Sequence, residues 1–431
     1  MEHPLSNPAE RAASYYQASS NPFQHRPPLQ EQLQADVAII GGGISGCSAA
    51  LHLAQRGYKV VQIEARQFGF GASGRSGGQL IFGLACSNDT IKQQLGKEAA
   101  QAIFAMSLEA LDLTRQLIQA HQIQCDLQSG VAIAALKNRH VRDLKAYQQE
   151  LTEEYGYDHL QWIEGVELPS YIQSKRYQAL LLDSRSGHLH PLNYTLGLAD
   201  AAQRHGVLQF ENTPALSITP HSKIKIATPE GAITADSVLL GTNAYIEHLG
   251  EPLQSYIMPV GTYILATEPL DSELAQSLLP QHNAIFDSQF VVDYFRLSAD
   301  NRLLFGGGVS YSRLPPRDLA ATMRQRMLTV FPQLAKVKTE FCWGGYVAIT
   351  QNRAPHFGRL APNIYFTQGY SGHGMALTGL AGKLVAEAIS GQAERFDLFA
   401  NIKHRRFWGG KYLKTPALVA AMGWYRMRDW L

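Results

Sequence analysis

A glycine-rich turn between a short apolar strand and a helix constrains the fold of this chain more than any other feature. Residues 36–40 read DVAII, which is typical of a buried parallel strand, and residues 41–46 read GGGISG, which matches the spacing G-x-G-x-x-G. Apolar residues at helical spacing follow over 44–56, and residues 58–64, YKVVQIE, predict a second strand. This β-α-β order predicts a Rossmann-like domain.

The residues of this unit also predict what it binds. Gly41 permits the tight turn, Gly43 lets the backbone approach a pyrophosphate, and Gly46 lets the helix pack closely on the strand. Backbone N–H groups at the start of the helix, at Ile44 and Ser45, attract phosphate charge. Glu64, followed by Ala65, would accept hydrogen bonds from a ribose. A glycine turn in a fold that binds nothing is the weaker interpretation, because the acid and both strands are present.

A second glycine-rich stretch follows Glu64 directly, over residues 69–79 (GFGASGRSGGQ). Small residues and a single arginine suit a backbone that lies against a long ligand continuing beyond its first ribose. This arrangement favours FAD over NAD, and we expect Arg75 to support the cofactor rather than the substrate. The other candidate cofactor-binding residues of this stretch are Gly71, Ala72, Ser73, Gly77, Gly78 and Gln79.

Composition narrows the class of protein further. A chain of 431 residues with 17% charged residues and a net charge of +2 is not a disordered protein, and we expect no binding to nucleic acid. Its four cysteines form no C-x-x-C pair, so a disulfide framework or zinc ribbon is not expected. Without a signal-like N-terminal stretch or an apolar run long enough to span a bilayer, the chain is expected to be cytoplasmic.

Four stretches in this order resemble the D-amino-acid-oxidase-like FAD-dependent oxidoreductases: 36–46, 69–79, 238–245 (VLLGTNAY) and 369–387 (GYSGHGMALTGLAGKLVAE). The likeness covers roughly residues 30–400. Within this family, SYY (14–16) and WGGYVAITQNRAPHFGR (343–359) resemble bacterial γ-glutamylputrescine oxidases, with L-pipecolate oxidases as near relatives.

The resemblance implies an α/β fold, α+β overall, in which a Rossmann-like FAD-binding domain of discontinuous segments is joined to a substrate domain built on an antiparallel sheet. We expect the FAD-binding domain over 30–95, 178–250 and 340–395 and the substrate domain over 96–177 and 251–339. Residues 1–29 would form an N-terminal arm and residues 396–431 a basic aromatic tail.

The resemblance also implies the chemistry. A small-molecule amine would lose a hydride to the flavin, the imine would hydrolyse, and oxygen would be reduced to hydrogen peroxide. Gly241 and Thr242 would end a strand near FAD, and the flavin edge would face the start of a late helix, at Gly372, His373, Gly374, Met375 and Ala376. FAD is expected to be non-covalent, because the position of the flavin-linking cysteine of sarcosine oxidases is Gly345 here.

One departure from the family bears on the substrate. The lysine with which sarcosine oxidases clamp a substrate carboxylate is replaced here by Ala376, which favours an amine whose carboxylate is remote from the reacting carbon or bound otherwise. The alternative function is an oxidase or dehydrogenase of a cyclic or N-methyl amino acid such as L-pipecolate or sarcosine.

The candidate catalytic residues are His373 beside the flavin, Tyr346 and Tyr294 lining the substrate, and Arg296, which could hold a substrate carboxylate bidentately. Each has a structural alternative: a turn histidine, core aromatics and an ion-paired arginine. For Arg353, a structural role in fixing the loop before the flavin turn is as consistent with the sequence as a role in the site.

The last 31 residues carry a net charge of +6 and three of the five tryptophans. Such a segment could bind an anionic membrane surface, in which case a quinone would become a plausible electron acceptor. We favour docking on the protein itself, because the remainder of the chain carries a net charge of −4.

Overall fold

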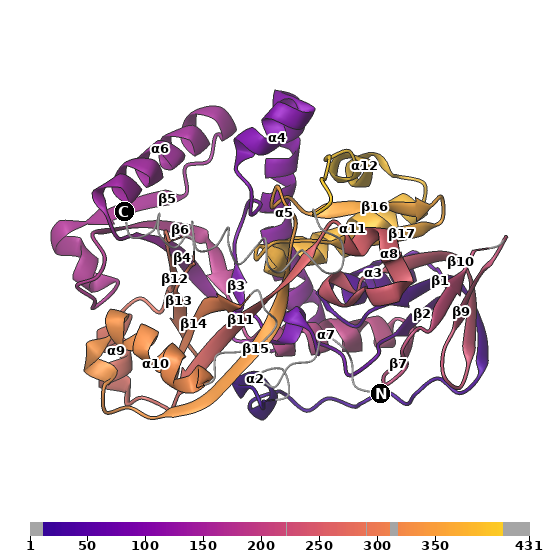
Figure 1. The fold of residues 1–431 in the computed structure, drawn as a ribbon, viewed down its shortest axis with the longest axis horizontal. Coiled ribbons are helices and arrows are strands. Elements are labelled where there is room, and N and C mark those ends of the chain that lie inside the picture. The colour runs from indigo at the N-terminus through magenta and orange to yellow at the C-terminus, as the bar shows by residue number, and fades with distance from the viewer. Residues whose placement is uncertain (1–11, 221, 290, 311–317, 408–431) are drawn as a thin grey trace.

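The computed structural model describes residues 12–220, 222–289, 291–310 and 318–407, and it consists of two sheets with helices packed against them (Figure 1). Sheet A lies on one side of the molecule with α3, α7 and α11, and sheet B lies on the other with α6, α9 and α10. The mixed α/β fold expected from the sequence is confirmed. The helices are α2 (Tyr15–Ala18), α3 (Ile44–Gln55), α4 (Asn88–Leu95), α5 (Lys97–His121), α6 (Asn138–Tyr155), α7 (Pro191–Arg204), α8 (Glu251–Gln254), α9 (Ser272–Leu278), α10 (Leu319–Val330), α11 (Gly374–Ile389) and α12 (Glu394–Ala400).

Sheet A contains the predicted β-α-β unit. Its strands are β1 (Gln32–Ile40), β2 (Val60–Ile63), β7 (Leu208–Phe210), β8 (Ser217–Thr219), β9 (Ile224–Ala227), β10 (Ala232–Leu240), β16 (His356–Ala361) and β17 (Ile364–Gln368). The order is β16-β17-β10-β1-β2-β7, with β9 and β8 added antiparallel beside β10. The five strands from β17 to β7 are parallel, so their carboxyl ends share one edge.

Helices α3 and α11 cover sheet A and pack against each other. Gly382 of α11 makes this close approach possible, because a Cβ atom there would lie 2.5 Å from the backbone nitrogen of Ala49 in α3. The largest apolar core lies between these helices, α5, α7 and the sheet, and it includes Leu51, Leu111 and Leu380. The two helices that begin at the site described below are therefore fixed to each other by backbone contact.

Sheet B is antiparallel apart from one parallel pair, β12 with β4. Its order is β15-β11-β14-β13-β12-β4-β6-β3, with β5 beside β6. Its strands are β3 (Gln79–Leu80), β4 (Gln128–Ala135), β5 (Leu160–Glu164), β6 (Ala179–His188), β11 (Met258–Thr267), β12 (Ala284–Asp287), β13 (Tyr294–Leu297), β14 (Leu303–Ser310) and β15 (Thr339–Ile349). A second core packs α9 and α10 on this sheet.

Short 3-10 turns complete the elements: η1 (Ala72–Gly74), η2 (Gly165–Ser170), η3 (Asn243–Tyr245), η4 (Glu247–Gly250) and η5 (Pro332–Leu334). Strands β3, β6 and β15 belong to sheet B, although their residues fall within segments expected to form the FAD-binding domain. The domain boundaries stay a prediction. Most of the basic aromatic tail, from residue 408 on, lies outside the described residues.

Residues 12–29 pack along both sheets and contain the short helix α2. The Tyr15 hydroxyl donates to Asp300 Oδ1 (2.7 Å) after β13, and the Tyr16 ring is fully buried. At the other end, Arg26 forms an ion pair with Asp200 in α7 (2.5 Å). The segment thus connects sheet B with the helices of sheet A.

Candidate active site

The first part of the site is the edge of sheet A where β1, β2 and β10 end. Gly41 follows β1 with φ +124°, a conformation that favours glycine, and a Cβ atom at this position would lie 2.7 Å from the carbonyl oxygen of Gly241. A Cβ on Gly46 would lie 2.1 Å from the Gly41 carbonyl oxygen. The turn therefore requires both glycines, as the spacing predicted, and Gly241 and Thr242 after β10 lie directly beside it.

The two glycine-rich stretches contact each other at the start of α3. The Gly69 amide donates to the Gly42 carbonyl (3.0 Å), and the Ile44 amide donates to the Ser73 hydroxyl (3.1 Å). A Cβ on Gly43 would lie 2.8 Å from that hydroxyl oxygen. Ser45 faces the sheet instead, with its hydroxyl 2.9 Å from the Thr367 hydroxyl. Gly71, Ala72 and Ser73 are thus held against the helix N-terminus, where anionic groups are stabilised.

Glu64 lies at the end of β2 and is fixed by backbone amides. Its carboxylate accepts hydrogen bonds from Gly42 (2.7 Å) and Arg66 (2.9 Å). Burial raises the pKa of this carboxyl, while the amide hydrogen bonds oppose the rise. Because each carboxylate oxygen can accept a second bond, the fixed Glu64 can still take hydroxyl groups of a ribose. Ala65, next in the chain, is exposed.

Arg75 connects this region with sheet B and α11. Its backbone carbonyl accepts from Trp343 Nε1 (3.1 Å), and its guanidinium donates to the carbonyls of Gly344 (3.3 Å) and Phe70 (3.2 Å). The next residue, Ser76, donates to the Met375 sulfur (3.4 Å) at the start of α11. Arg75 therefore supports the glycine-rich loop through backbone contacts, which agrees with a cofactor role rather than a substrate role.

The start of α11 also belongs to the site. Gly372 has φ +100°, the half-buried His373 precedes the first turn of the helix, and Gly374 begins it. Burial, and then the charge of Arg353, lower the pKa of His373 to about 4, so its ring is neutral at neutral pH. Met375 and Ala376 are buried beneath this turn.

The residues fit FAD. At Gly41 and Gly43 the chain is packed so closely against Gly241 and Ser73 that neither position has room for a side chain, which keeps the turn narrow. The Thr242 hydroxyl oxygen is buried and has no hydrogen-bond partner among the described residues, so it is available to a ligand. An elongated dinucleotide can follow the sequence of contacts from Glu64 past the start of α3 to the start of α11.

Tyr294 lies against the second glycine-rich stretch. A Cβ on Gly77 would lie 2.7 Å from its ring, and a Cβ on Gly306 would lie 2.0 Å from it. Burial raises the pKa of its hydroxyl, so the phenol stays protonated at neutral pH. The ring thus packs on the loop that leads through Gly78 and Gln79 into β3, where it could line the substrate.

Arg296 has a structural position. Its side chain donates to the carbonyls of Gly77 (2.8 Å), Leu189 (2.9 Å) and Leu297 (3.2 Å) and to the Tyr16 hydroxyl (3.2 Å), and the residue is 4% exposed. Four of the five N–H positions are therefore in use. The expected contact with a substrate carboxylate does not agree with this geometry, because the guanidinium is occupied in holding the Gly77 loop through its backbone carbonyl.

Tyr346 is a core residue in this structure. It is 1% exposed, belongs to the apolar core on the sheet A side, and its ring lies 6.3 Å from that of Tyr245. The proposed role in lining the substrate is not favoured, because successive residues of β15 face opposite sides and it is Gly345 that faces Arg75.

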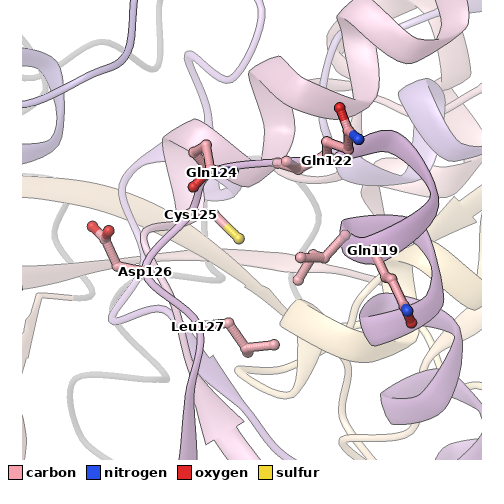
Figure 2. A pocket seen from close by; sticks show the side chains of 8 residues that line it. Gln119, Gln122, Gln124, Cys125, Asp126 and Leu127 are labelled. Carbon is pink, nitrogen blue, oxygen red and sulfur yellow. The ribbon is translucent and has the colours of Figure 1, made fainter.

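The described residues also line two pockets. One of about 630 Å³ is lined by the end of α5 and the residues that follow it, and Figure 2 shows the Cys125 sulfur turned toward it and Asp126 turned away. A second, of about 430 Å³, lies between residues 17–25 and the loop 67–75 and shares Gly74 and Arg75 with the cofactor loop. Over the described part of the chain, histidine, cysteine and acidic side chains form no group of three that could hold a metal ion.

The sequence reasoning missed two residues that shape the site. Asn243, with φ +47°, accepts from the Gly369 amide (3.0 Å), and Ser371, with φ +53°, accepts from the Thr350 amide (3.2 Å). Arg353, with φ +61°, was left open between two roles. Positive φ is uncommon outside glycine, and only Asn243 carried a sequence signal, as an asparagine directly after a strand and a Gly-Thr pair.

Known proteins resemble this chain in sequence and in fold. The sequence profile of a family described as "DAO: FAD dependent oxidoreductase" matches residues 36–388. The chain is 42% identical over 425 residues to "Probable oxidoreductase OrdL" of Haemophilus influenzae, covering 97% of this chain and 98% of the relative. It is 40% identical over 421 residues to "Gamma-glutamylputrescine oxidoreductase" of Escherichia coli, covering 97% and 99%.

Among solved structures, glycine oxidase from Geobacillus kaustophilus matches with a TM-score of 0.72 at 21% identity, covering 88% of this chain and all of the other. At this level of identity the match establishes the fold alone. None of the helices within the described ranges combines the length and the apolar character needed to cross a membrane.

Proposed function

This chain belongs to the DAO family of FAD-dependent oxidoreductases. From this premise we propose that it oxidises the terminal amine of the putrescine part of γ-glutamylputrescine, or of a similar polyamine derivative. As a member of this family the chain is an FAD-dependent oxidoreductase that acts on amine C–N groups. The proposal adds the substrate and oxygen as the acceptor. The amine loses two electrons and two protons to become an imine, water hydrolyses the imine to an aldehyde and ammonia, and oxygen takes up the electrons and protons as hydrogen peroxide.

The observation that carries the proposal is the identity of 40% over nearly the whole length of the γ-glutamylputrescine oxidoreductase of Escherichia coli. The start of α11 supports it independently. Ala376, at the position where the family's carboxylate-clamping lysine would stand, is 2% exposed and uncharged. A site built this way lacks a cation close to the reacting carbon at that position, so it suits a substrate whose carboxylate lies far from the oxidised amine.

FAD, when bound, accepts the hydride and then passes electrons to oxygen. The residues of this chain bind the cofactor and set the polarity around it. Gly41, Gly43 and Glu64 hold the nucleotide part, and the start of α11 presents backbone amides, which stabilise negative charge. The neutral ring of His373, with a pKa lowered to about 4, can exchange a hydrogen bond there without adding a fixed charge.

The test is anaerobic mixing of the purified, flavin-loaded enzyme with γ-glutamylputrescine, L-pipecolate and sarcosine in separate stopped-flow experiments. We expect γ-glutamylputrescine to bleach the oxidised flavin at least about tenfold faster than the two amino acids, a difference of about 1.4 kcal/mol in activation free energy. Faster bleaching by L-pipecolate or sarcosine would assign the alternative function. If none of the three reduces the flavin, the proposed substrate class is wrong.

The electron acceptor is tested in the same preparation. Under air, oxidation of γ-glutamylputrescine should yield one hydrogen peroxide per aldehyde formed, measured by coupled peroxidase. A low peroxide yield together with rapid reoxidation by a soluble quinone would contradict oxygen as the acceptor.

A further inference from the structure

The turn that connects β15 to β16 places an arginine in an unusual backbone conformation. Arg353 has φ +61°, in the left-handed region that non-glycine residues seldom adopt. The turn is closed by the Arg353 amide, which donates to the Thr350 carbonyl (3.2 Å), and by the Thr350 hydroxyl, which donates to the Ala354 carbonyl (2.7 Å). Such a conformation persists only where surrounding contacts fix it.

Two segments distant in sequence supply those contacts. On one side lies the C-terminal strap, which we define as residues 401–407. The side-chain amide of Asn352 donates to the Lys403 carbonyl (3.0 Å), and that of Gln351 donates to the Arg406 carbonyl (2.9 Å). On the other side lies the turn before α11, where the Ser371 hydroxyl accepts from the Thr350 amide (3.2 Å). The turn is therefore held between the strap and the start of α11.

The guanidinium held in this way lacks a counter-charge. Arg353 forms no ion pair or hydrogen bond through its side chain with the described residues, although its Nε atom is shielded from solvent. Other arginines in partly buried positions are paired: Arg326 with Asp293 (2.6 Å) and Arg359 with Asp397 (2.5 Å). A shielded donor without an acceptor is costly, so its presence points to a ligand.

The charge of Arg353 acts on groups in and beside the candidate active site. The pKa of His373 is lowered first by burial and second by the positive charge of Arg353. This charge also acts on Cys86 in the loop after β3, where burial raises the pKa of the thiol and the arginine partly opposes the rise. The two arginines nearer the cofactor loop, Arg75 and Arg296, donate to backbone carbonyls instead.

We propose that Arg353 binds the carboxylate of the amine substrate, at the end remote from the amine that is oxidised. This inference rests on the proposed function and deepens it: the substrate class is an amine linked through several bonds to a carboxylate. The guanidinium matches a carboxylate bidentately, which fixes orientation as well as charge. A cation at position 376 would bind a carboxylate close to the reacting carbon. Arg353 would instead bind a carboxylate that lies far from it.

The first experiment compares two substrates in the flavin-loaded enzyme: γ-glutamylputrescine, which carries a carboxylate, and N-acetylputrescine, which does not. Arg353→Gln should lower kcat/KM for γ-glutamylputrescine by about 10- to 100-fold, mainly through KM, as expected for a charged hydrogen bond. For N-acetylputrescine the change should stay within about threefold. Arg353→Lys should recover part of the loss, since lysine restores the charge but cannot bind a carboxylate bidentately.

Arg406→Gln is the matched control. Arg406 lies in the strap beside the same turn, is exposed, and contacts the Tyr256 hydroxyl (3.2 Å), so the variant removes the same charge from the same region. Both substrates should keep their wild-type kcat/KM in it. Flavin content and thermal midpoint are measured in every variant, so that a folding defect is separated from a binding defect.

A second experiment avoids turnover. Glutarate, a dicarboxylate that cannot be oxidised, is titrated into the oxidised enzyme while the flavin spectrum is followed. The wild type should bind it, and Arg353→Gln should raise the dissociation constant at least about tenfold. Equal binding by both proteins overturns the inference, as does an equal loss on both amines in the first experiment.

The two hypotheses fail in different ways. If wild-type enzyme does not oxidise γ-glutamylputrescine, the proposed function is wrong. If it does so and Arg353→Gln leaves the preference for the carboxylate-bearing amine unchanged, the function stands and the role of Arg353 is wrong.

Discussion

The nucleotide cradle and the substrate side of the site are built in opposite ways. The cradle is made of glycine backbone brought close to its neighbours, at Gly41 against the Gly241 backbone and at Gly43 against the short Ser73 side chain. The substrate side that we propose, at the start of α11 and the turn of Arg353, is made of side chains from separate elements. Phosphate binds equally to any backbone amide, whereas a particular amine requires particular side chains. The first kind of site is therefore local in sequence, and the second is not.

Breaking the cradle should have the largest effect on flavin binding. Gly41→Ala would place a Cβ 2.7 Å from the Gly241 carbonyl oxygen, so the turn must open, and we expect flavin content to fall at least about tenfold, a loss of 1.4 kcal/mol or more in binding. The flavin absorbance of purified protein measures it.

Gly57→Ala is the control for this variant. Gly57 also has positive φ (+86°), but a Cβ there meets nothing within 4 Å. It should cost only about 1 kcal/mol of backbone strain and keep its flavin. Equal flavin loss in both variants would show that conformation, and not the close approach to Gly241, is what the glycine provides.

A buried side chain that supports the cradle should have the next largest effect. Arg296→Lys keeps the charge but cannot reach the carbonyls of Gly77 and Leu189 together, so we expect about 3 kcal/mol less unfolding free energy, measured with urea, and weaker flavin binding. Arg359→Lys, in a half-exposed pair with Asp397, should cost 1 kcal/mol or less, about what such pairs contribute. Comparable losses in the two variants would contradict a special role for Arg296.

Acid should weaken the protein through buried histidines. His190 caps α7 by accepting from the Asn193 amide (3.1 Å), and burial and then the Arg296 charge lower its pKa to about 3. The folded-state pKa is below the unfolded value of about 6.5, so this stability is present above pH 6.5 and is lost as pH falls toward 3. One such group costs about 2 kcal/mol between pH 6.5 and pH 5.

His190→Asn isolates this effect, because asparagine can cap the helix but does not titrate. Urea unfolding at several pH values should show a slope smaller by about one proton in the variant. His188, with its pKa also lowered to about 3, keeps part of the slope. An unchanged slope would exclude His190 as a contributor.

The smallest effect concerns the segment that connects the two sides. Tyr15→Phe removes the hydrogen bond to Asp300, whose carboxylate still accepts from Ser298 and Arg302, so the loss should be about 1 kcal/mol. Tyr58→Phe removes only a long contact of 3.5 Å to the Ile389 carbonyl and should change the unfolding free energy less. A larger loss in Tyr58→Phe would reverse our ranking of the two contacts.

The same contrast explains what could be predicted from sequence. The β-α-β unit and its glycines were predictable because each requirement is met within about thirty residues. The surroundings of Arg296 and Tyr346 could not be predicted, because they come from segments far away in the chain: Arg296 meets Gly77 and Tyr16, and Tyr346 meets the core of sheet A. An arginine on a strand looks the same in sequence whether it faces a ligand or a row of carbonyls.

Arg353 illustrates a second limit. Its role depends on the C-terminal strap and on a turn closed by Thr350, and neither is signalled by residues 351–353 themselves. Polar composition likewise concealed that Tyr15 and Tyr16 are buried. Long-range contacts of this kind appear only once the topology is known.

The N-terminal arm also has a consequence for how the polypeptide matures on the ribosome. Tyr15 and its partner Asp300 are separated by 285 positions, and at 5–20 residues per second the tyrosine waits roughly 15–60 s for its partner to be synthesised. During that time the two adjacent tyrosine rings have no burial site, which makes the nascent arm a natural client for chaperones. One of the first segments to be translated is therefore among the last to reach its native contacts.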